Sequence, residues 1–188
     1  MSMPTNTAEQ LVNTSVTLMK LHGYHGFSYA DVAREVGIRK ASIHHHFAAK
    51  QDLAAEAIRV YTKQTQIKLE EILREEETPL GRLQAFGAIF LNTFLAEGSM
   101  CLCASLTSDW ESLPELVQQQ VSAYWDHARA WLRTSLWDEH SPLPDRQRTA
   151  RANAIISLLE GALLCARADA HEQALRDAIQ ASEVLLKH

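Results

Sequence analysis

One short stretch of this chain concentrates side chains that donate hydrogen bonds. They are Arg39, Lys40, Ser42, His44 and His45. Guanidinium, ammonium, hydroxyl and imidazole groups can donate to phosphate oxygens and to the polar edges of DNA bases. Ala41 is small and would let a helix that carries these donors approach base edges closely. Lys50, where the following helix is expected to start, could meet a phosphate together with the amides of that helix N-terminus.

The residues give less support to a metal site or to an enzyme active site. The run from His44 to His46 could suggest a metal site, but consecutive helical residues point about 100° apart and cannot chelate one ion together. We find no paired carboxylates, no nucleophile beside a base and no Glu-x-x-His spacing within one expected helix. We therefore expect no enzyme activity, no cofactor and no metal. A helical-bundle enzyme and a protein-interaction module without a DNA role are the alternatives, which a gel-shift assay would separate from a DNA-binding protein.

Two cysteines, Cys101 and Cys103, stand one residue apart, and Cys165 follows in a later apolar segment. On a helix the first two thiols diverge, so a disulfide between them would be strained and a metal would lack partners. One interpretation makes both residues small members of a core, and the other makes one of them a reactive thiol that senses oxidants or electrophiles. Three cysteines without a secretory signal predict reduced thiols and a cytoplasmic protein.

The donors need a scaffold, and the residues around them predict a helix-turn-helix. Ser28 begins a short helix, and Asp31 completes a Ser-x-x-Asp capping box. Gly37 can end that helix in the left-handed conformation, and a further helix follows from about Arg39. Five apolar side chains of this segment can converge into a small core that leaves the donors on the outer face. These are Val32, Val36, Ile38, Ile43 and Phe47.

Helical periodicity continues along the chain, and no segment shows the alternation of a strand. Helices are expected over about 8–21, 50–74, 83–97, 100–106, 114–137, 145–168 and 171–187. A second capping box, Ser112 with Glu115, is expected to start the helix near Pro114, with the proline in its first turn. The predicted fold class is therefore all-α. An N-terminal three-helix DNA-binding domain with the helix-turn-helix (1–50) precedes a larger helical ligand-binding and dimerisation domain (51–188).

The charge of the chain is unevenly distributed. The formal net charge is −5, yet the stretch from Arg34 to Lys50 holds four cations and one acid, Glu35. An acidic protein with one basic region indicates a single anion-facing surface rather than general adhesion to nucleic acid. The first residues lack the basic region and apolar run of a signal peptide, and no apolar run approaches the length of a membrane span. We therefore expect no membrane partner.

Aromatic residues are spaced to line a cavity in the expected C-terminal domain. Together with one cysteine, they are the candidate contacts of a small apolar or aromatic effector. They are Phe86, Phe90, Phe94, Cys101, Trp110, Tyr124, Trp125 and Trp131. An ordinary hydrophobic core is the alternative for each of them. The last two helices are apolar on more than one face, which indicates a homodimer interface or, alternatively, a buried hairpin within one chain.

The sequence from Gly23 to Leu53, GYHGFSYADVAREVGIRKASIHHHFAAKQDL, resembles the N-terminal domain of the TetR/AcrR family of ligand-responsive transcription regulators. The resemblance implies an all-helical homodimer that binds double-stranded operator DNA. It also implies a repressor that a small-molecule effector releases from its operator. The alternative on the same scaffold is a thiol-based sensor that switches through Cys101 or Cys103.

The resemblance also assigns residues to DNA. It implies phosphate contacts at Ser28, His45 and Lys50, and base reading by residues 39–44. Two positions depart from the family pattern, because Arg39 stands where Ser or Thr is common and His44 where Tyr is common. Both side chains still offer hydrogen bonds.

Overall fold

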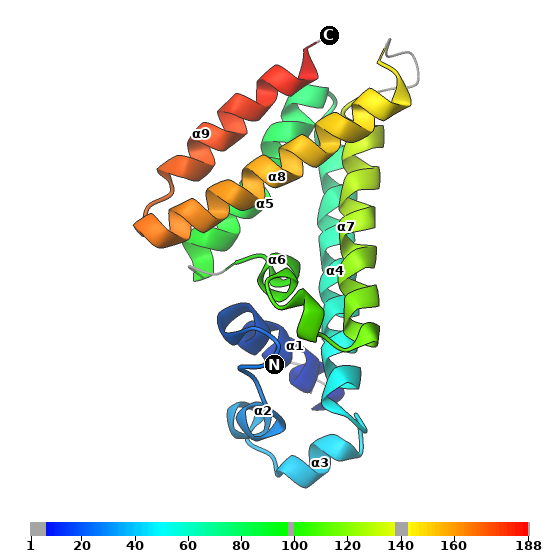
Figure 1. The fold of residues 1–188 in the computed structure, drawn as a ribbon, viewed down its shortest axis with the longest axis vertical. Coiled ribbons are helices and arrows are strands. Elements are labelled where there is room, and N and C mark those ends of the chain that lie inside the picture. Colours follow the sequence, from blue (N-terminus) through cyan, green and yellow to red (C-terminus); the bar gives the residue numbers. More distant parts are fainter. Residues whose placement is uncertain (1–6, 98–99, 138–142, 188) are drawn as a thin grey trace. The chain divides into compact units, whose positions relative to one another are not determined.

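The computed structural model describes residues 7–97, 100–137 and 143–187, and no strand occurs in these ranges (Figure 1). The all-α prediction is confirmed. The helices are α1 (Thr7–His22), α2 (Tyr29–Val36), α3 (Lys40–His44), α4 (Lys50–Glu75), α5 (Pro79–Glu97), α6 (Leu102–Thr107), α7 (Glu115–Ser135), α8 (Asp145–Asp169) and α9 (Gln173–Ser182). Two 3-10 turns, η1 (Trp110–Ser112) and η2 (Glu183–Leu186), follow α6 and α9.

The chain divides into two compact units. The first unit comprises the described residues through Gln64 together with Leu102–Tyr124. The second unit comprises Thr65–Cys101 and the described residues from Trp125 onward. This division falls inside α4 and inside α7, so each of these helices contributes residues to both units. The division does not coincide with the expected functional boundary after residue 50, which stays a prediction.

The first unit packs its short helices around a few fully buried side chains. Of the five predicted core positions of the helix-turn-helix, Val32 and Ile43 are completely buried, and the other three are half-buried. Helices α2 and α3 have only eight and five residues, too few to enclose every apolar side chain between them. Helix α6 packs against α1, and the Ser105 hydroxyl donates to the Met19 carbonyl across 3.4 Å.

The second unit is built on α5, α8 and α9, which pack against one another. Gly87 allows α5 and α9 to approach closely, because a Cβ atom at this position would lie 2.6 Å from Cγ1 of Ile179. By length and composition alone α8 could cross a membrane, with a mean hydropathy of 1.2 over 18 residues, a test that core helices of soluble proteins also pass. The expectation that no apolar run approaches the length of a membrane span is therefore corrected.

The second predicted capping box is wrong. The Ser112 hydroxyl donates to the Asp109 carbonyl across 2.7 Å, and Nε2 of His25 lies 2.8 Å from Oγ of Ser112. Helix α7 begins at Glu115 instead, where the carbonyl of Pro114 accepts the first helical hydrogen bonds. Pro114 therefore lies just before the first turn rather than inside it. A tertiary partner, invisible to local sequence, engages the serine that the pattern had assigned to the helix.

Candidate nucleic-acid interface

The helix-turn-helix is fixed at both ends of α2. Ser28 has an extended backbone, its oxygen accepts from the Asp31 amide across 3.3 Å, and its hydroxyl donates to the Asp31 carboxylate across 2.7 Å. These bonds confirm the predicted capping box, and the Ser28 hydroxyl is the main cause of the lowered pKa of Asp31. Gly37 ends α2 with φ 76°, and its amide donates to the Ala33 carbonyl. An L side chain in that left-handed conformation would be strained, so the turn depends on glycine.

Helix α3 presents the predicted donors to solvent. Ile43 is completely buried, whereas the side chains around it are exposed or, at Ser42, half-buried. The exposed set is Arg39, Lys40, Ala41, His44 and His45. This is the arrangement that a recognition helix needs, since its base-reading side chains must be free to reach the groove while a buried residue anchors the helix. Contact of these residues with DNA stays a prediction.

Tyr29 ties the end of α3 to α2. Its hydroxyl donates to the Phe47 carbonyl across 3.0 Å, and its ring meets the His44 ring edge-on at 5.0 Å. Burial, followed by the charge of Asp52, raises the pKa of Tyr29 to about 12, so the hydroxyl stays protonated well above neutral pH. Nδ1 of His44 lies 3.3 Å from the Ala48 carbonyl. His44 is therefore both exposed and held in place, as a base-contacting side chain should be.

The Lys50 side chain is packed against aromatic rings and is not fully solvated, as a lysine that binds phosphate at a surface would be. It is the first residue of α4 and half-buried, with its ammonium 4.4 Å from the ring centre of Tyr24 and 4.6 Å from that of Phe27. Burial lowers the pKa of this ammonium. The Asp52 carboxylate accepts from the Ala49 amide across 2.9 Å, which satisfies one amide at the start of α4. The positive charge of Lys50 is thus fixed beside the helix-turn-helix by aromatic faces.

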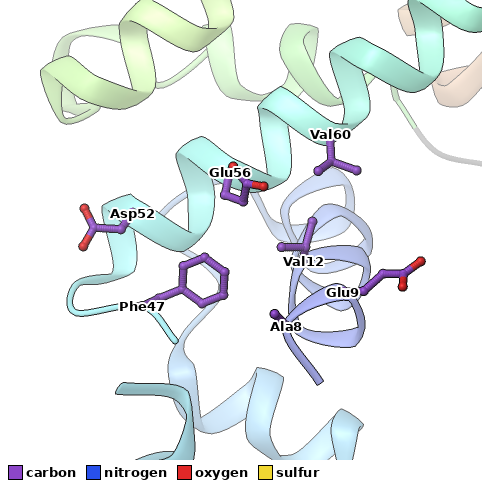
Figure 2. A pocket seen from close by; sticks show the side chains of 7 residues that line it. All are labelled: Ala8, Glu9, Val12, Phe47, Asp52, Glu56 and Val60. Carbon is purple, nitrogen blue, oxygen red and sulfur yellow. The ribbon is translucent and has the colours of Figure 1, made fainter. Parts of the chain in front are cut away.

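A hollow of about 460 Å³ lies in the first unit, between α1 and α4 (Figure 2). Its apolar lining is Ala8, Val12, Phe47 and Val60, and its acidic lining is Glu9, Asp52 and Glu56. Arg59 is hydrogen-bonded to Glu56 at 2.6–2.7 Å and lowers the pKa of that carboxyl. Carboxylates repel phosphate, so this hollow is unsuited to a nucleic-acid backbone.

The predicted effector contacts fall into both units, and the structure brings only some of them together. In the second unit Phe86 stacks on Trp131 with ring centres 5.5 Å apart and meets Phe90 edge-on at 5.4 Å. Phe94, Cys101 and Trp125 also belong to the second unit. Trp110 and Tyr124 belong to the first unit, where Tyr124 lies 5.7 Å from the Tyr61 ring. An effector role for any of the eight stays a prediction.

A second hollow, of about 360 Å³, lies beside the aromatic cluster of Phe86, Phe90 and Trp131. It is lined by side chains of the second-unit parts of α4 and α7. They are Gln66, Leu69, Glu70, His127, Ala130, Trp131 and Thr134. The indole nitrogen of Trp131 donates to the Leu69 carbonyl across 3.2 Å, which holds the ring between the two helices.

Glu160 is not among the residues predicted from the sequence, although it interrupts the most apolar segment of the chain, 154–166. Both of its carboxyl oxygens are buried, and neither meets a partner at hydrogen-bonding geometry among the described residues. Burial raises the pKa of Glu160 to about 7, which the nearby Cys101 thiol partly opposes. A single acid inside an apolar run is the signal that could have identified this site.

The three cysteines differ in access to solvent. Cys101 and Cys103 are buried, Cys165 is exposed, and none of them forms a disulfide. Within the described ranges, no group of three or more His, Cys, Asp or Glu side chains is placed to hold a metal ion.

The N-terminal part of the chain is similar in sequence to known bacterial regulators. A family model described as "Bacterial regulatory proteins, tetR family" matches residues 11–57. The "Uncharacterized HTH-type transcriptional regulator YxaF" of Bacillus subtilis is 28% identical over 82 residues, 43% of either chain. The "Biofilm operon icaADBC HTH-type negative transcriptional regulator IcaR" of Staphylococcus aureus is 29% identical over 51 residues, 27% of either chain. The match thus spans less than half the length of these curated relatives.

Solved structures match over much more of the chain. A TetR transcriptional regulator from Legionella pneumophila is 31% identical, with full coverage of both chains and a TM-score of 0.91. A TetR-family regulator from Agrobacterium tumefaciens is 30% identical, covers 96% of this chain and 95% of its own, and has a TM-score of 0.82. The reduced form of Escherichia coli NemR is 20% identical with a TM-score of 0.84, which is a likeness of fold alone.

Proposed function

Because this chain belongs to the TetR family of bacterial regulatory proteins, we propose that it represses transcription by binding operator DNA and leaves the operator when a small molecule binds its second unit. The observation that carries the proposal is the set of exposed donors on and beside α3, around the fully buried Ile43. Repression is supported by IcaR, which is described as a negative regulator.

The proposed DNA contacts divide into base reading and phosphate binding. Arg39 and Lys40 are suited to the major groove, because guanidinium and ammonium groups donate to O6 and N7 of guanine. His45 is exposed and would contact a phosphate directly. Ser28 and Lys50 would also contact phosphates, for which the Ser28 hydroxyl would have to leave Asp31 and the Lys50 ammonium would have to leave the rings of Tyr24 and Phe27. The net charge of −5 leaves this basic region as the part of the molecule best suited to a polyanion.

The proposed switch uses the helix that belongs to both units. Helix α4 begins beside the helix-turn-helix at Lys50 and continues into the second unit beyond Gln64. A ligand that displaces its later turns would displace the start of the same helix, because an α-helix transmits such shifts as a rigid element. A coupling of about 1–3 kcal/mol between effector and DNA would suffice.

Binding to DNA selected from a random-sequence pool tests the proposal directly. We expect the wild-type chain to enrich a roughly palindromic sequence and to bind it in fluorescence anisotropy. Lys40→Ala should weaken that binding by about 10-fold or more while leaving the circular dichroism unchanged, because Lys40 is exposed and a lost base contact costs about 1–3 kcal/mol.

The matched control is Lys63→Ala, which removes the same charge from an exposed position of α4. It should bind the selected DNA nearly as well as the wild type. Failure to enrich any sequence would contradict DNA binding and favour the protein-interaction alternative. Equal binding by the Lys40 variant and the wild type would remove α3 from the interface.

A thiol switch is a second candidate function, and one contact favours it. The Cys101 thiol interacts with the buried Glu160 carboxyl, which could take up the thiol proton as the sulfur forms a bond to an electrophile such as a quinone. We prefer the reversible, non-covalent switch because Cys101 and Cys103 are both buried.

A further inference from the structure

The burial of the Glu160 carboxyl in the second unit is energetically unfavourable. Both carboxyl oxygens are buried without a described partner at hydrogen-bonding geometry. Burying a carboxylate without compensation is among the most expensive arrangements in a protein, and such a group needs a physical reason. Its surroundings on α8 are apolar, since Ile156 and Leu163, four residues before and three after it, are both buried.

Packing alone does not require a carboxyl at this position. A methionine or leucine would fill a similar volume and would bury no polar group. Glu160 is also the only acid between the two ends of α8, Asp145 and Asp169, so it is not part of a solvated row of charges. The Cys101 thiol is a weak donor and compensates little of the lost hydration.

We propose that the Glu160 carboxyl is the polar anchor of the effector site, where it accepts a hydrogen bond from a donor group on an otherwise apolar ligand. The inference rests on the proposed function, because it takes the second unit to be the effector-binding part. A protonated amine and a hydroxyl share this donor chemistry. The apolar part of the ligand suits the aromatic side chains of the same unit, where Phe86, Phe90 and Trp131 cluster.

Three probes of one shape test the anchor on the full-length chain by isothermal titration calorimetry. They are 2-aminoindane (cationic donor), 2-indanol (neutral donor) and 2-methylindane (no donor). We expect the dissociation constant of at least one donor probe to be at least about 10-fold lower than that of 2-methylindane. This ratio corresponds to about 1.4 kcal/mol of binding free energy. Tight binding of the amine alone identifies a cationic effector, and tight binding of 2-indanol identifies a hydroxyl-bearing one.

Two substitutions locate the preference on Glu160. Glu160→Met should abolish it, because the acceptor is gone, and should fold at least as stably as the wild type. Glu160→Gln should lose the preference for 2-aminoindane and keep that for 2-indanol, because an amide oxygen still accepts a hydrogen bond. The matched control, Asp169→Asn, removes a charge from an exposed position of the same helix and should retain the wild-type order.

Equal affinities of the three probes, no binding by either donor probe, or a preference that survives in Glu160→Met would overturn the anchor. Operator binding is measured separately, so the two proposals can fail independently. If donor probes bind preferentially but do not release DNA, Glu160 would still be a ligand anchor. Release by an effector would then no longer be part of the proposed function. A chain that binds no operator would refute the repressor while the calorimetry still decides the role of Glu160.

Discussion

At the scale of single residues, Glu160 links the stability of the protein to pH. Its pKa in the folded chain is raised by burial from the ordinary 4.5 to about 7. The folded chain therefore binds more protons than the unfolded chain between these values. The resulting stability is fully present below pH 4.5 and is lost as the pH rises through 7. The difference amounts to roughly 3 kcal/mol, at about 1.4 kcal/mol for each pKa unit.

Urea unfolding at pH 5 and at pH 8 measures this contribution. From pH 5 to pH 8, the free energy of unfolding should fall by about 2 kcal/mol or more further in the wild type than in Glu160→Gln. The variant has no proton to release at this position. Asp169→Asn, on the same helix but exposed, should follow the wild type. Parallel profiles for the wild type and Glu160→Gln would show that this carboxyl is solvated in the folded protein.

The thiols give a second prediction at this scale. Replacing both Cys101 and Cys103 with Ser should leave release of DNA by a reversible effector intact, with some loss of stability because a hydroxyl loses more hydration than a thiol when it is buried. Operator binding is followed by fluorescence anisotropy with and without mild peroxide or a quinone. Cys165→Ser is the matched control, since that thiol is exposed. Release by peroxide that disappears in the double variant but persists in the control would favour the covalent switch.

At the scale of elements, α3 illustrates how tertiary contacts define a very short helix. Five residues cannot form a stable helix alone, because nucleation costs more than so few hydrogen bonds return. The burial of Ile43 and the hydrogen bond from Tyr29 to the Phe47 carbonyl hold the segment instead. The exposed side chains of Lys40 and Ala41 therefore take no part in holding α3, whereas His44 also packs against Tyr29.

The contact between α5 and α9 gives a prediction for Gly87. Gly87→Ala should destabilise the protein by about 1–3 kcal/mol, because the new methyl group would overlap the side chain of Ile179. Ile179→Ala removes the three carbon atoms that lie within 3.2 Å of that methyl position. Thermal unfolding of the two single variants and the double variant should therefore show that the losses are not additive. Additive losses would mean that the two helices do not approach each other at Gly87.

At the scale of the whole molecule, exposed apolar residues point to association between copies of the chain. Leu164 on α8 and Val184 in η2 are 58% and 63% exposed. Leucine and valine so exposed on two helical elements of one unit fit a homodimer surface better than a buried hairpin. Two helix-turn-helix units in such a dimer would read half-sites about 34 Å apart, or a multiple of that distance.

Substitution of exposed leucines tests the dimer. Leu164→Glu should shift the protein toward a monomer in light scattering at micromolar concentration and weaken operator binding, because it places a charge in the proposed interface. Leu95→Glu on α5 is the matched control, with a similar exposure of 55% in the same unit, and should remain dimeric. A monomeric wild type, or the same mass for both variants, would contradict the assignment of α8 to the interface.

Local chemistry allowed the sequence to determine the helices and the helix-turn-helix. The capping box of Ser28 with Asp31 and the left-handed Gly37 act within a few residues, so their effect can be predicted without knowing the fold. The same reasoning failed at Ser112, where the pattern is alike but the hydroxyl is engaged by Asp109 and lies beside His25. A local rule holds only where no distant residue competes for the same group.

Only the tertiary structure decided which distant residues meet. It joined Phe86 to Trp131, assigned Trp110 and Tyr124 to the other unit, and removed the Glu160 carboxyl from solvent beside Cys101. Helical periodicity predicts that a side chain lies on a buried face, but the partner across that face depends on how helices far apart in sequence pack together. Burial and its consequences for pKa therefore follow from the packing, whereas helix type and ends follow from the residues themselves.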